Sequence, residues 1–365
     1  MRESFAAELD ALYQHHLADR GTADRQYLLR LLTFRNGLEW VARLGLFASL
    51  ALLPQWGHAF ASATGFWLLL SLSVVGLALA KILDNMEIGH NILHGQWDWM
   101  NDPKIRSDRW EWDHACPSSQ WRHSHNVEHH TWTNVLGMDR DIGYGMLRVT
   151  DHQRWHPFYL LQPLNVVLMA VFFEWFIALH DLNIARILKG KQDPQKTRAI
   201  LGEIKRKARR QIVKDYLLWP LLAGPFFGII LGANVAANVL RNIWTFVIIF
   251  CGHFPAGVHH FRKADIAGES RGQWYHRQIL GSCNIRGGRL FHILSGNLSH
   301  QIEHHLFPDL PSNRYPLVAP KVEDICQRYG VPYNAAGFTR QLGTTLLQLL
   351  RLTLPSPRPR RVQPA

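Results

Sequence analysis

Cysteine is scarce in this sequence, and its scarcity excludes several kinds of protein. The four cysteines, Cys116, Cys251, Cys283 and Cys326, form no C-x-x-C pair. They are too few for a disulfide scaffold, which indicates a reducing compartment for the working part of the chain. The sequence also lacks the H-E-x-x-H signature of zinc metalloproteases and the G-x-G-x-x-G fingerprint of nucleotide-binding domains.

Charged residues are few as well. They make up 19% of the 365 residues, below the roughly 25% that is typical of soluble domains. Hydrophobic residues reach 47%, yet the mean hydropathy of −0.11 argues against a chain that lies mostly in a membrane. The composition predicts a few apolar hairpins together with a substantial water-facing part. The net charge of +12 suits anionic lipid or a phosphate-bearing substrate as well as nucleic acid.

Two apolar segments, 38–53 and 59–82, are separated by a turn at 54–57. A membrane span needs about 20 mostly apolar residues, and Trp56 in the turn suits the membrane interface. Residues 216–250 form a second apolar block that is long enough for two spans, with a weak break at 232–234. We therefore expect an all-α membrane protein with two transmembrane helical hairpins, four spans in total.

A third apolar block, 157–179, contains several polar residues. The loop that follows it, 189–214, holds ten Lys and Arg residues against two acids, and such loops stay cytoplasmic. We therefore expect the third block to lie in the interface or to dip in and out, so that both termini lie inside. A soluble all-α protein is the alternative, but the near-continuous apolar run at 59–82 disfavours it.

These features divide the chain into three parts. Residues 1–37 form a cytoplasmic N-terminal segment, residues 38–345 form the main domain, and residues 346–365 form a Pro/Arg-rich tail.

The histidines fall mainly into two windows. Of the 21 histidines, seven lie between His90 and His130 and eight between His253 and His305. Each window directly follows a predicted hairpin, so both are expected on the cytoplasmic face of the membrane, in a helical cap. The sequence therefore predicts that histidines from distant segments meet there.

Three histidine boxes stand within these windows. The first is H-N-I-L-H at 90–94, the second is H-N-V-E-H-H at 125–130, and the third is H-Q-I-E-H-H at 300–305. Histidines at i and i+4 share one face of a helix, and a doublet points two rings about 100° apart. The three boxes together contain eight histidines. A single tetrahedral zinc ion needs only three or four ligands, so the boxes offer enough imidazoles for two metal ions. Imidazole alone does not separate iron from zinc, copper or nickel.

The three boxes resemble those of the membrane fatty acid desaturases, and most closely those of the bacterial acyl-CoA branch. The resemblance covers roughly residues 30–335 and rests on GHNILH at 89–94, WRHSHNVEHHTWTNVLGMDRDI at 121–142 and SGNLSHQIEHHLFPDLPSNRY at 295–315. It implies a site with two iron ions. The implied ligands are His90, His94, His125, His129, His130, His253, His304 and His305.

The third box departs from the family pattern. Family members place His or Gln three residues before the final doublet, and Gln301 stands at that position here. Gln301 is expected to face the site, while His300 is either a further ligand or a bystander. His259 and His260 rank below His253 as the intermediate ligand.

The resemblance implies O2-dependent introduction of a double bond into a long acyl chain, with acyl-CoA or an acyl lipid as the substrate. Such chemistry needs a redox cofactor and electrons from outside. Because no iron–sulfur cysteine set and no cytochrome b5 motif is present, the donor is expected to be a separate ferredoxin- or cytochrome-type carrier with its reductase. We expect an integral protein of the cell (cytoplasmic) membrane with an active site on the cytoplasmic face, membrane lipid as a partner and no nucleic-acid partner.

Two alternatives stay open from the sequence. One is a di-iron enzyme of the same class that hydroxylates, ketolates or epoxidises its substrate. The other is a histidine-rich membrane zinc transporter.

Overall fold

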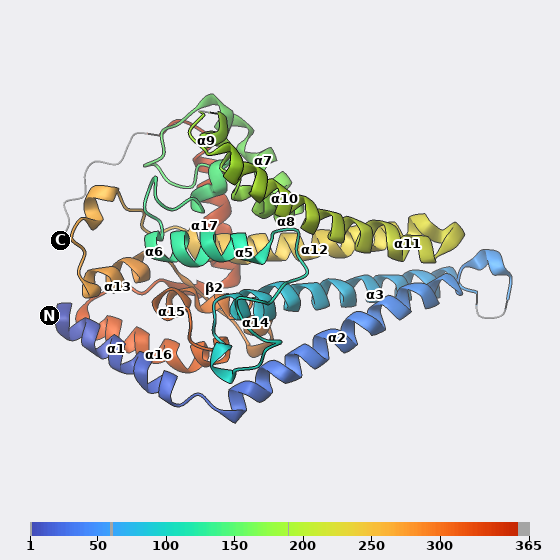
Figure 1. Ribbon diagram of the computed structural model, residues 1–365, viewed down its shortest axis with the longest axis horizontal. Helices are drawn as coiled ribbons and strands as arrows, with labels where there is room; N and C mark the ends of the chain where they lie inside the picture. The colour runs from blue at the N-terminus through green and yellow to red at the C-terminus, as the bar shows by residue number, and fades with distance from the viewer. Residues whose placement is uncertain (1, 59–60, 189, 357–365) are drawn as a thin grey trace.

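The protein consists of long helices on one side and a cap of shorter helices on the other (Figure 1). The structure is a computed structural model and describes residues 2–58, 61–188 and 190–356. The α-helices are α1 (Arg2–Ala18), α2 (Thr22–Leu50), α3 (Ala63–Leu83), α4 (Asn91–Leu93), α5 (Ser118–Trp121), α6 (His130–Trp132), α7 (Gln162–Val171), α8 (Phe173–His180), α9 (Ile184–Leu188), α10 (Pro194–Gln211), α11 (Trp219–Leu222), α12 (Phe227–His253), α13 (Arg271–Leu280), α14 (Arg289–Leu294), α15 (Gln301–Leu306), α16 (Tyr315–Tyr329) and α17 (Phe338–Arg351). Wider π-helical turns form η2 (Asp84–His90), η4 (Arg122–His129) and η7 (Ile212–Leu218).

In the described part of the chain, two helices are long and apolar enough to cross a membrane. One runs from Ala63 to Leu93 through α3, η2 and α4, and the other runs from Gly224 to His253 through α12. A bent pair, Pro157–Val171 and Phe173–His180, meets at 94° and adds a third candidate if it counts as one broken span. This bend agrees with a segment that dips into the interface. The predominantly helical fold is therefore confirmed, while the number of four spans stays a prediction.

The break in the second apolar block was predicted at the wrong place. Gly232, Ala233 and Asn234 lie inside the continuous helix α12. The chain instead turns at Ala223-Gly224-Pro225, between α11 and α12. Gly224 has a φ of +55°, a conformation that side-chain-bearing residues rarely adopt, and proline cannot continue the preceding helix. Gly224 and Pro225 therefore interrupt the helix, whereas residues 232–234 leave α12 continuous.

The expectation of an all-α chain was also incomplete. Strands β1 (Asn284–Arg286) and β2 (Ala335–Gly337) pair in parallel, with Ile285 opposite Ala336. They join the segment before the third histidine box to the start of α17. Helix α17 continues across residue 345, where the tail was expected to begin, and residues 357–365 of that tail lie outside the described part of the chain. The three-part division of the chain stays a prediction.

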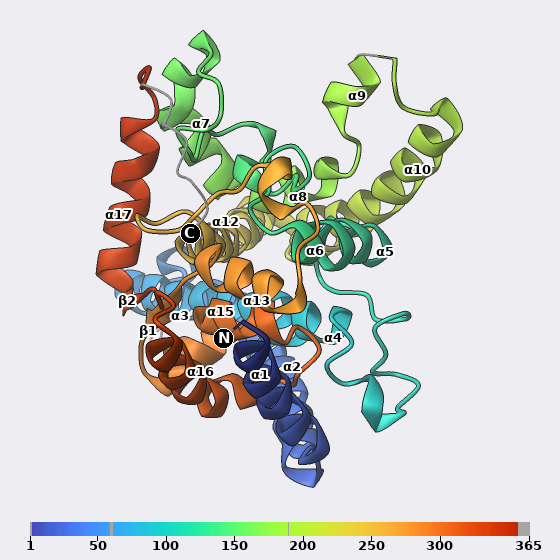
Figure 2. The same ribbon diagram turned by 90° about the vertical axis from the view of Figure 1, so that its left-hand side faces the viewer.

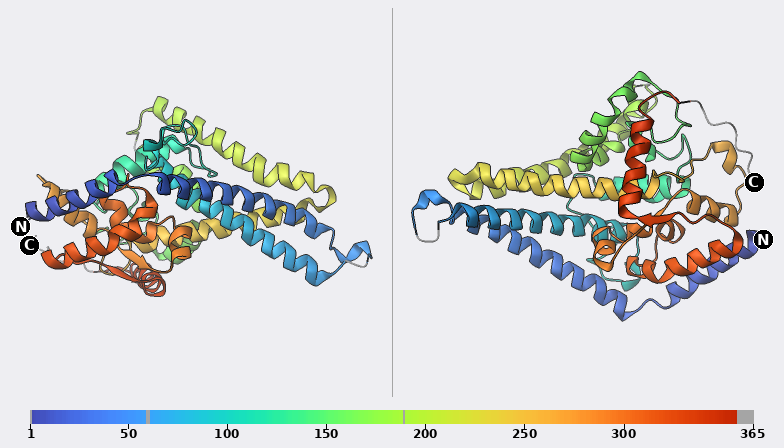
Figure 3. Two further views of the ribbon diagram at one scale, coloured as in Figure 1. Left: turned by 90° about the horizontal axis from the view of Figure 1, so that it is seen from below. Right: turned by 180° about the vertical axis from the view of Figure 1, so that it is seen from behind.

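The long helices pack as two pairs. Helices α2 and α3 lie along each other, and the far part of the continuous helix α10–η7–α11 lies along α12, so that both pairs extend away from the cap (Figures 1 and 3). Small and aliphatic residues fill the interface, among them Ala42, Leu46, Leu77, Ala78 and Ala237. Seen along the long helices, the cap elements surround the ends of α3 and α12 (Figure 2).

Buried ion pairs fix the long helices to one another and to the bent pair. In α12, the guanidinium of Arg241 lies 2.7 Å from a carboxylate oxygen of Glu174 in α8, and both side chains are buried. Lys81 lies 2.8 Å from Asp215 and 2.9 Å from Asp113. Charges in such places are stable only when they are paired, so these contacts set how the helices lie at the level of the cap.

Candidate metal centre

The ends of the two long apolar helices bring the first histidines together. His90 and His94 stand at the end of the Ala63–Leu93 helix, and His253 is the last residue of α12. The first box is not a regular α-helix: η2 is a π-helix that ends at His90, and a turn of π-helix is typical of functional sites. The rings of His90 and His94 lie 4.6 Å apart.

The second box lies on η4, which is also a π-helix. In this geometry His125 and His129 stack with ring centroids 5.0 Å apart, while the ring plane of His130 lies at 81° to that of His129. The third box begins at η10 (Leu298–His300) and continues in α15, where the ring planes of His304 and His305 also lie at 81° to each other. The two rings of each doublet are therefore nearly perpendicular.

The histidine rings converge into two groups that could each hold a metal ion. The ligand atoms of His90, His94, His125 and His304 all lie within 4.8 Å of one another, and so do those of His129, His253 and His305. We call these groups cluster 1 and cluster 2. A third possible group, made by His125, His129 and Asp141, joins the two. Cluster 1 and cluster 2 combine residues from all three boxes and from the end of α12.

His130 lies between the two clusters. Its ring is 4.7 Å from that of His94, 4.7 Å from that of His304 and 4.4 Å from that of His305. Both of its nitrogens are buried and have no hydrogen-bond partner among the described residues. The structure thus brings together all eight histidines that the sequence analysis proposed, and their assignment as ligands stays a prediction.

Nitrogen atoms without partners show that the clusters fit metal ions. The Nε2 atoms of His94, His125 and His304 are buried and have no hydrogen-bond partner among residues 2–58, 61–188 and 190–356. On the far side of the ring, Nδ1 of His304 lies 3.3 Å from the Tyr315 hydroxyl. A ring that is held at one nitrogen and left unpaired at the other is typical of a metal ligand.

Four of the rings are also in the protonation state that binds metal. The pKa values of four histidines lie well below the usual range for histidine: those of His94, His130, His304 and His305. Burial is the largest cause, and the neighbouring histidines lower the pKa values further. These imidazoles are therefore neutral at neutral pH, and neutral imidazole is the form that coordinates metal.

Carboxylates orient the histidines of the second box. Nδ1 of His129 lies 3.0 Å from Oδ2 of Asp139, and Nδ1 of His125 lies 3.6 Å from Oδ2 of Asp141. Two other acids close to the boxes in sequence have different partners, since Glu128 pairs with Arg140 and Asp309 accepts a hydrogen bond from the Tyr13 hydroxyl.

His180 was not proposed as a site residue in the sequence analysis. Its Nε2 atom lies 3.0 Å from Oδ1 of Asp141, and its ring packs 5.3 Å from that of Tyr144. Because His180 stands 50 residues after His130, only the fold shows that it reaches the site; the adjacent Asp181 in a mostly apolar segment was the one available signal.

The two uncertain residues of the third box have different surroundings. The Gln301 amide nitrogen lies 2.9 Å from Nε2 of His253, so Gln301 contacts cluster 2. His300 turns away and stacks on His292 at 4.5 Å, outside both clusters. His260 stacks on Phe254 and belongs to neither cluster.

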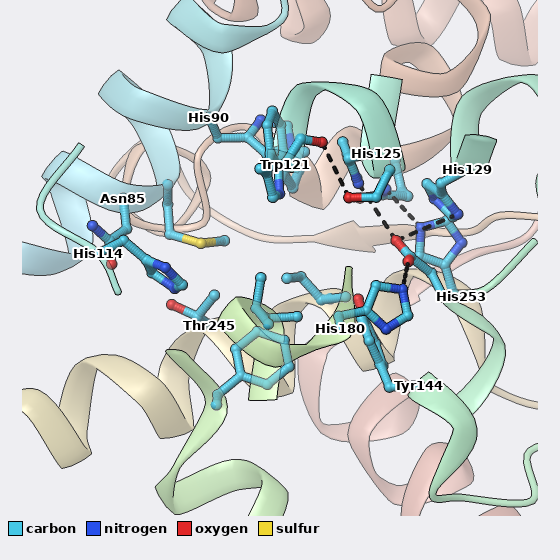
Figure 4. Close-up of a pocket in the computed structure, with 18 of the residues that line it drawn as sticks. Asn85, His90, His114, Trp121, His125, His129, Tyr144, His180, Thr245 and His253 are labelled. Carbon is cyan, nitrogen blue, oxygen red and sulfur yellow. Dashed lines mark hydrogen bonds and ion pairs between the residues drawn. The ribbon is translucent and has the colours of Figure 1, made fainter. Parts of the chain in front are cut away.

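A cavity runs along both clusters (Figure 4). It is narrow, with a volume of about 60 Å³. His90, His125, His129 and His253 line one part of it. The rest is lined largely by apolar and aromatic side chains, including Met86, Trp112, Phe173, Ile177 and Ile249. An apolar chain in this cavity would pass beside the histidines.

The site and the fold define a helical protein with histidine clusters that can bind metal and with helices apolar enough to span a membrane. The sequence profile of the family described as "Fatty acid desaturase" matches residues 64–337, so this chain belongs to the fatty acid desaturase family. The chain is 46% identical over 357 residues to the "NADPH-dependent stearoyl-CoA 9-desaturase" of Mycobacterium tuberculosis, covering 97% of this chain and 80% of that protein. The family and the desaturase function predicted from the histidine boxes are therefore confirmed.

More distant relatives carry other desaturase names. The chain is 28% identical to the "sn-1 linoleoyl-lipid 6-desaturase" of Synechocystis over 73% of this chain and 75% of that protein. It is 33% identical to human "Fatty acid desaturase 3" over 129 residues, which are 35% of this chain and 26% of that protein.

Proposed function

We propose that this protein introduces a double bond at carbon 9 of a long, saturated, CoA-linked acyl chain. The observation that carries the proposal is the single cavity that joins an apolar passage to both histidine clusters. The name of the mycobacterial relative, with 46% identity over nearly the whole chain, supports the CoA-linked substrate and the position of the double bond.

The residues of both clusters fit two iron ions, which His90, His94, His125 and His304 on one side and His129, His253 and His305 on the other would hold. His130 lies between these sets and is proposed to complete them. Bound iron supplies activation of O2, since no side chain can oxidise an unactivated methylene pair. In the overall reaction the acyl chain loses two hydrogens, and O2 with two electrons and two protons from outside is reduced to two waters.

The chain's own residues prepare this chemistry. Asp139 holds the Nδ1 proton of His129 on the side of the ring away from cluster 2, and Asp141 lies between His125 and His180. The apolar cavity wall excludes water and aligns the acyl chain, so that its reacting carbons stay beside the histidines. The electron donor is a separate ferredoxin- or cytochrome-type carrier, reduced by an enzyme that uses NADPH.

We also propose that the protein lies in the cytoplasmic membrane as four spans, with the clusters on the cytoplasmic side. The second half of α2 packs along α3. Its side chains Trp40, Val41 and Leu44 are 60%, 68% and 66% exposed, which is expected of residues that face lipid. The basic helix α10 and the cap lie at the same end of the long helices (Figure 1), which agrees with the excess of Lys and Arg on the cytoplasmic side.

The test is an assay of the purified protein with stearoyl-CoA, O2 and a reduced ferredoxin, followed by gas chromatography of the acyl products. The expected product is the chain with one new double bond at carbon 9. A hydroxylated, keto or epoxide product would contradict the proposal, and so would a protein that contains one exchangeable zinc ion per chain and no iron.

A further inference from the structure

A second cavity lies between α2, α14 and the start of α16, and it shares no lining residue with the cavity at the clusters. Its volume is about 790 Å³, within the range of about 300–1,000 Å³ for ligand sites. We call it the α2–α14 groove. The residues of interest in its wall are Tyr27, Arg30, Phe34, Arg289, His292 and Leu317.

A tight backbone contact separates the groove from the metal site. A side-chain carbon placed on Gly296 would lie 2.7 Å from the backbone of Met86, so the loop at Gly296 packs directly on the end of the long helix. Met86 lines the cavity at the clusters, while Asn297, the residue after Gly296, lines the groove. The Asn91 amide also donates a hydrogen bond to the Gly296 carbonyl. Packed backbone therefore separates the groove from the histidines at this point.

Two arginines in the groove are not neutralised by the protein. Within residues 2–58, 61–188 and 190–356, neither Arg30 nor Arg289 forms an ion pair or a side-chain hydrogen bond. The acids near the wall are already satisfied. Glu87 accepts hydrogen bonds from Tyr27, Asn297 and Ser312.

The other nearby acid is Asp24, which is held by Arg314 and Asn313. Arg30 and Arg289 thus remain available to an anion from outside. Guanidinium groups match the geometry of phosphate oxygens well.

The groove changes from basic to apolar along α2. Phe34 and Leu317 at its rim are 59% and 61% exposed. Val41, seven residues after Phe34, lies on the same face of the helix and is 68% exposed. This face continues into the half of α2 that is proposed to cross the membrane. A phosphate near Arg30 with a hydrocarbon chain along Phe34 and Val41 would match the groove at both ends.

We propose that the α2–α14 groove binds a membrane phospholipid, whose anionic headgroup phosphate contacts Arg30 and Arg289 and whose acyl chain lies along α2. Because the groove shares no lining residue with the cavity at the clusters, we assign it to a lipid that is not the substrate. It is thus distinct from the acyl-CoA site proposed above and does not depend on it.

Native mass spectrometry of the full-length protein in detergent tests the proposal, with phosphatidylglycerol as the titrated probe. The double variant Arg30→Gln/Arg289→Gln is expected to bind the lipid at least about tenfold more weakly, because it loses two charge-assisted contacts. Arg25→Gln is the matched control, since Arg25 is an exposed arginine of α2 that does not line the groove. Added lipid should raise the unfolding temperature of the wild type and the control, but not that of the double variant.

Three outcomes would overturn the proposal. The first is equal lipid affinity of the double variant and the wild type. The second is displacement of bound phosphatidylglycerol by stearoyl-CoA, which would assign the groove to the substrate. The third is arginine-dependent binding of inorganic phosphate without binding of the lipid. If the glutamine pair fails to fold, Arg30→Lys/Arg289→Lys gives a second test, because lysine keeps the charge but loses the bidentate contact; weaker lipid binding is expected, and unchanged binding would count against the proposal.

Discussion

Nδ1 of His129 lies 3.0 Å from Oδ2 of Asp139, and the backbone fixes that carboxylate from two directions. The N–H of Asn134 donates to Oδ2 at 2.8 Å, and the N–H of Asp141 donates to Oδ1 at 2.9 Å. Burial lowers the pKa of His129, but the charge and hydrogen bond of Asp139 outweigh it and leave the pKa raised. Asp139 thus both orients the ring and increases its basicity.

The change Asp139→Asn tests this positioning role. The amide keeps the size of the side chain but loses the charge that orients His129, so iron affinity or turnover should fall about 10–100-fold. Iron content per chain and stearoyl-CoA turnover measure the effect. Asp309→Asn is the control, because Asp309 contacts Tyr13 and not a cluster. Full iron content together with wild-type turnover in Asp139→Asn would contradict the role.

The third box offers a matched pair of histidines. His304→Ala removes a buried ligand atom of cluster 1, and we expect loss of iron and of detectable activity with the helical content unchanged. His300→Ala removes a ring that stacks on His292 outside the clusters, and we expect it to keep its iron. Metal analysis and circular dichroism of both variants check this. Iron loss in His300→Ala would show that this ring is a ligand after all.

Gly252 controls the position of Gln301. A side-chain carbon on Gly252 would lie 3.1 Å from Cγ, Cδ and Oε1 of Gln301, so Gly252→Ala should push the amide away from His253. We expect a several-fold loss of turnover with little loss of stability, and Gly252→Ala/Gln301→Ala should be no worse than Gln301→Ala alone. Additive losses in the double variant would instead indicate independent roles.

The sequence predicted the histidines better than it predicted the helices that carry them. Spacing at i and i+4, with a doublet, was enough to propose that His125, His129 and His130 reach two sites. It did not show that the helix around them is π-helical, because that depends on packing with distant segments. His180 illustrates the same limit, since it meets Asp141 only through the bend between α7 and α8.

The buried pair between Glu174 and Arg241 should be important for stability. Glu174→Gln leaves the Arg241 guanidinium without its ion partner in a buried place, and removing one partner of such a pair costs about 3–5 kcal/mol. Thermal unfolding in detergent should show a clear decrease in midpoint temperature. Arg286→Gln, which breaks the exposed pair with Glu323, should change it little. Equal midpoints for the two variants would rule out a stabilising role for the buried pair.

Thr245 is placed to limit the length of the acyl chain. It lines the cavity near His114 and Asn85, at the end away from His129 and His253 (Figure 4). Thr245→Trp should fill this end, because tryptophan adds a large ring to a space that a small side chain leaves open. Turnover of stearoyl-CoA should therefore fall much more than turnover of a substrate four carbons shorter, measured under the same conditions. Thr245→Ser, which keeps the hydroxyl and the small size, should keep the wild-type preference. If Thr245→Trp lowers both substrates equally, this end of the cavity does not hold the end of the chain, and the acyl group must lie in the opposite direction along the histidines.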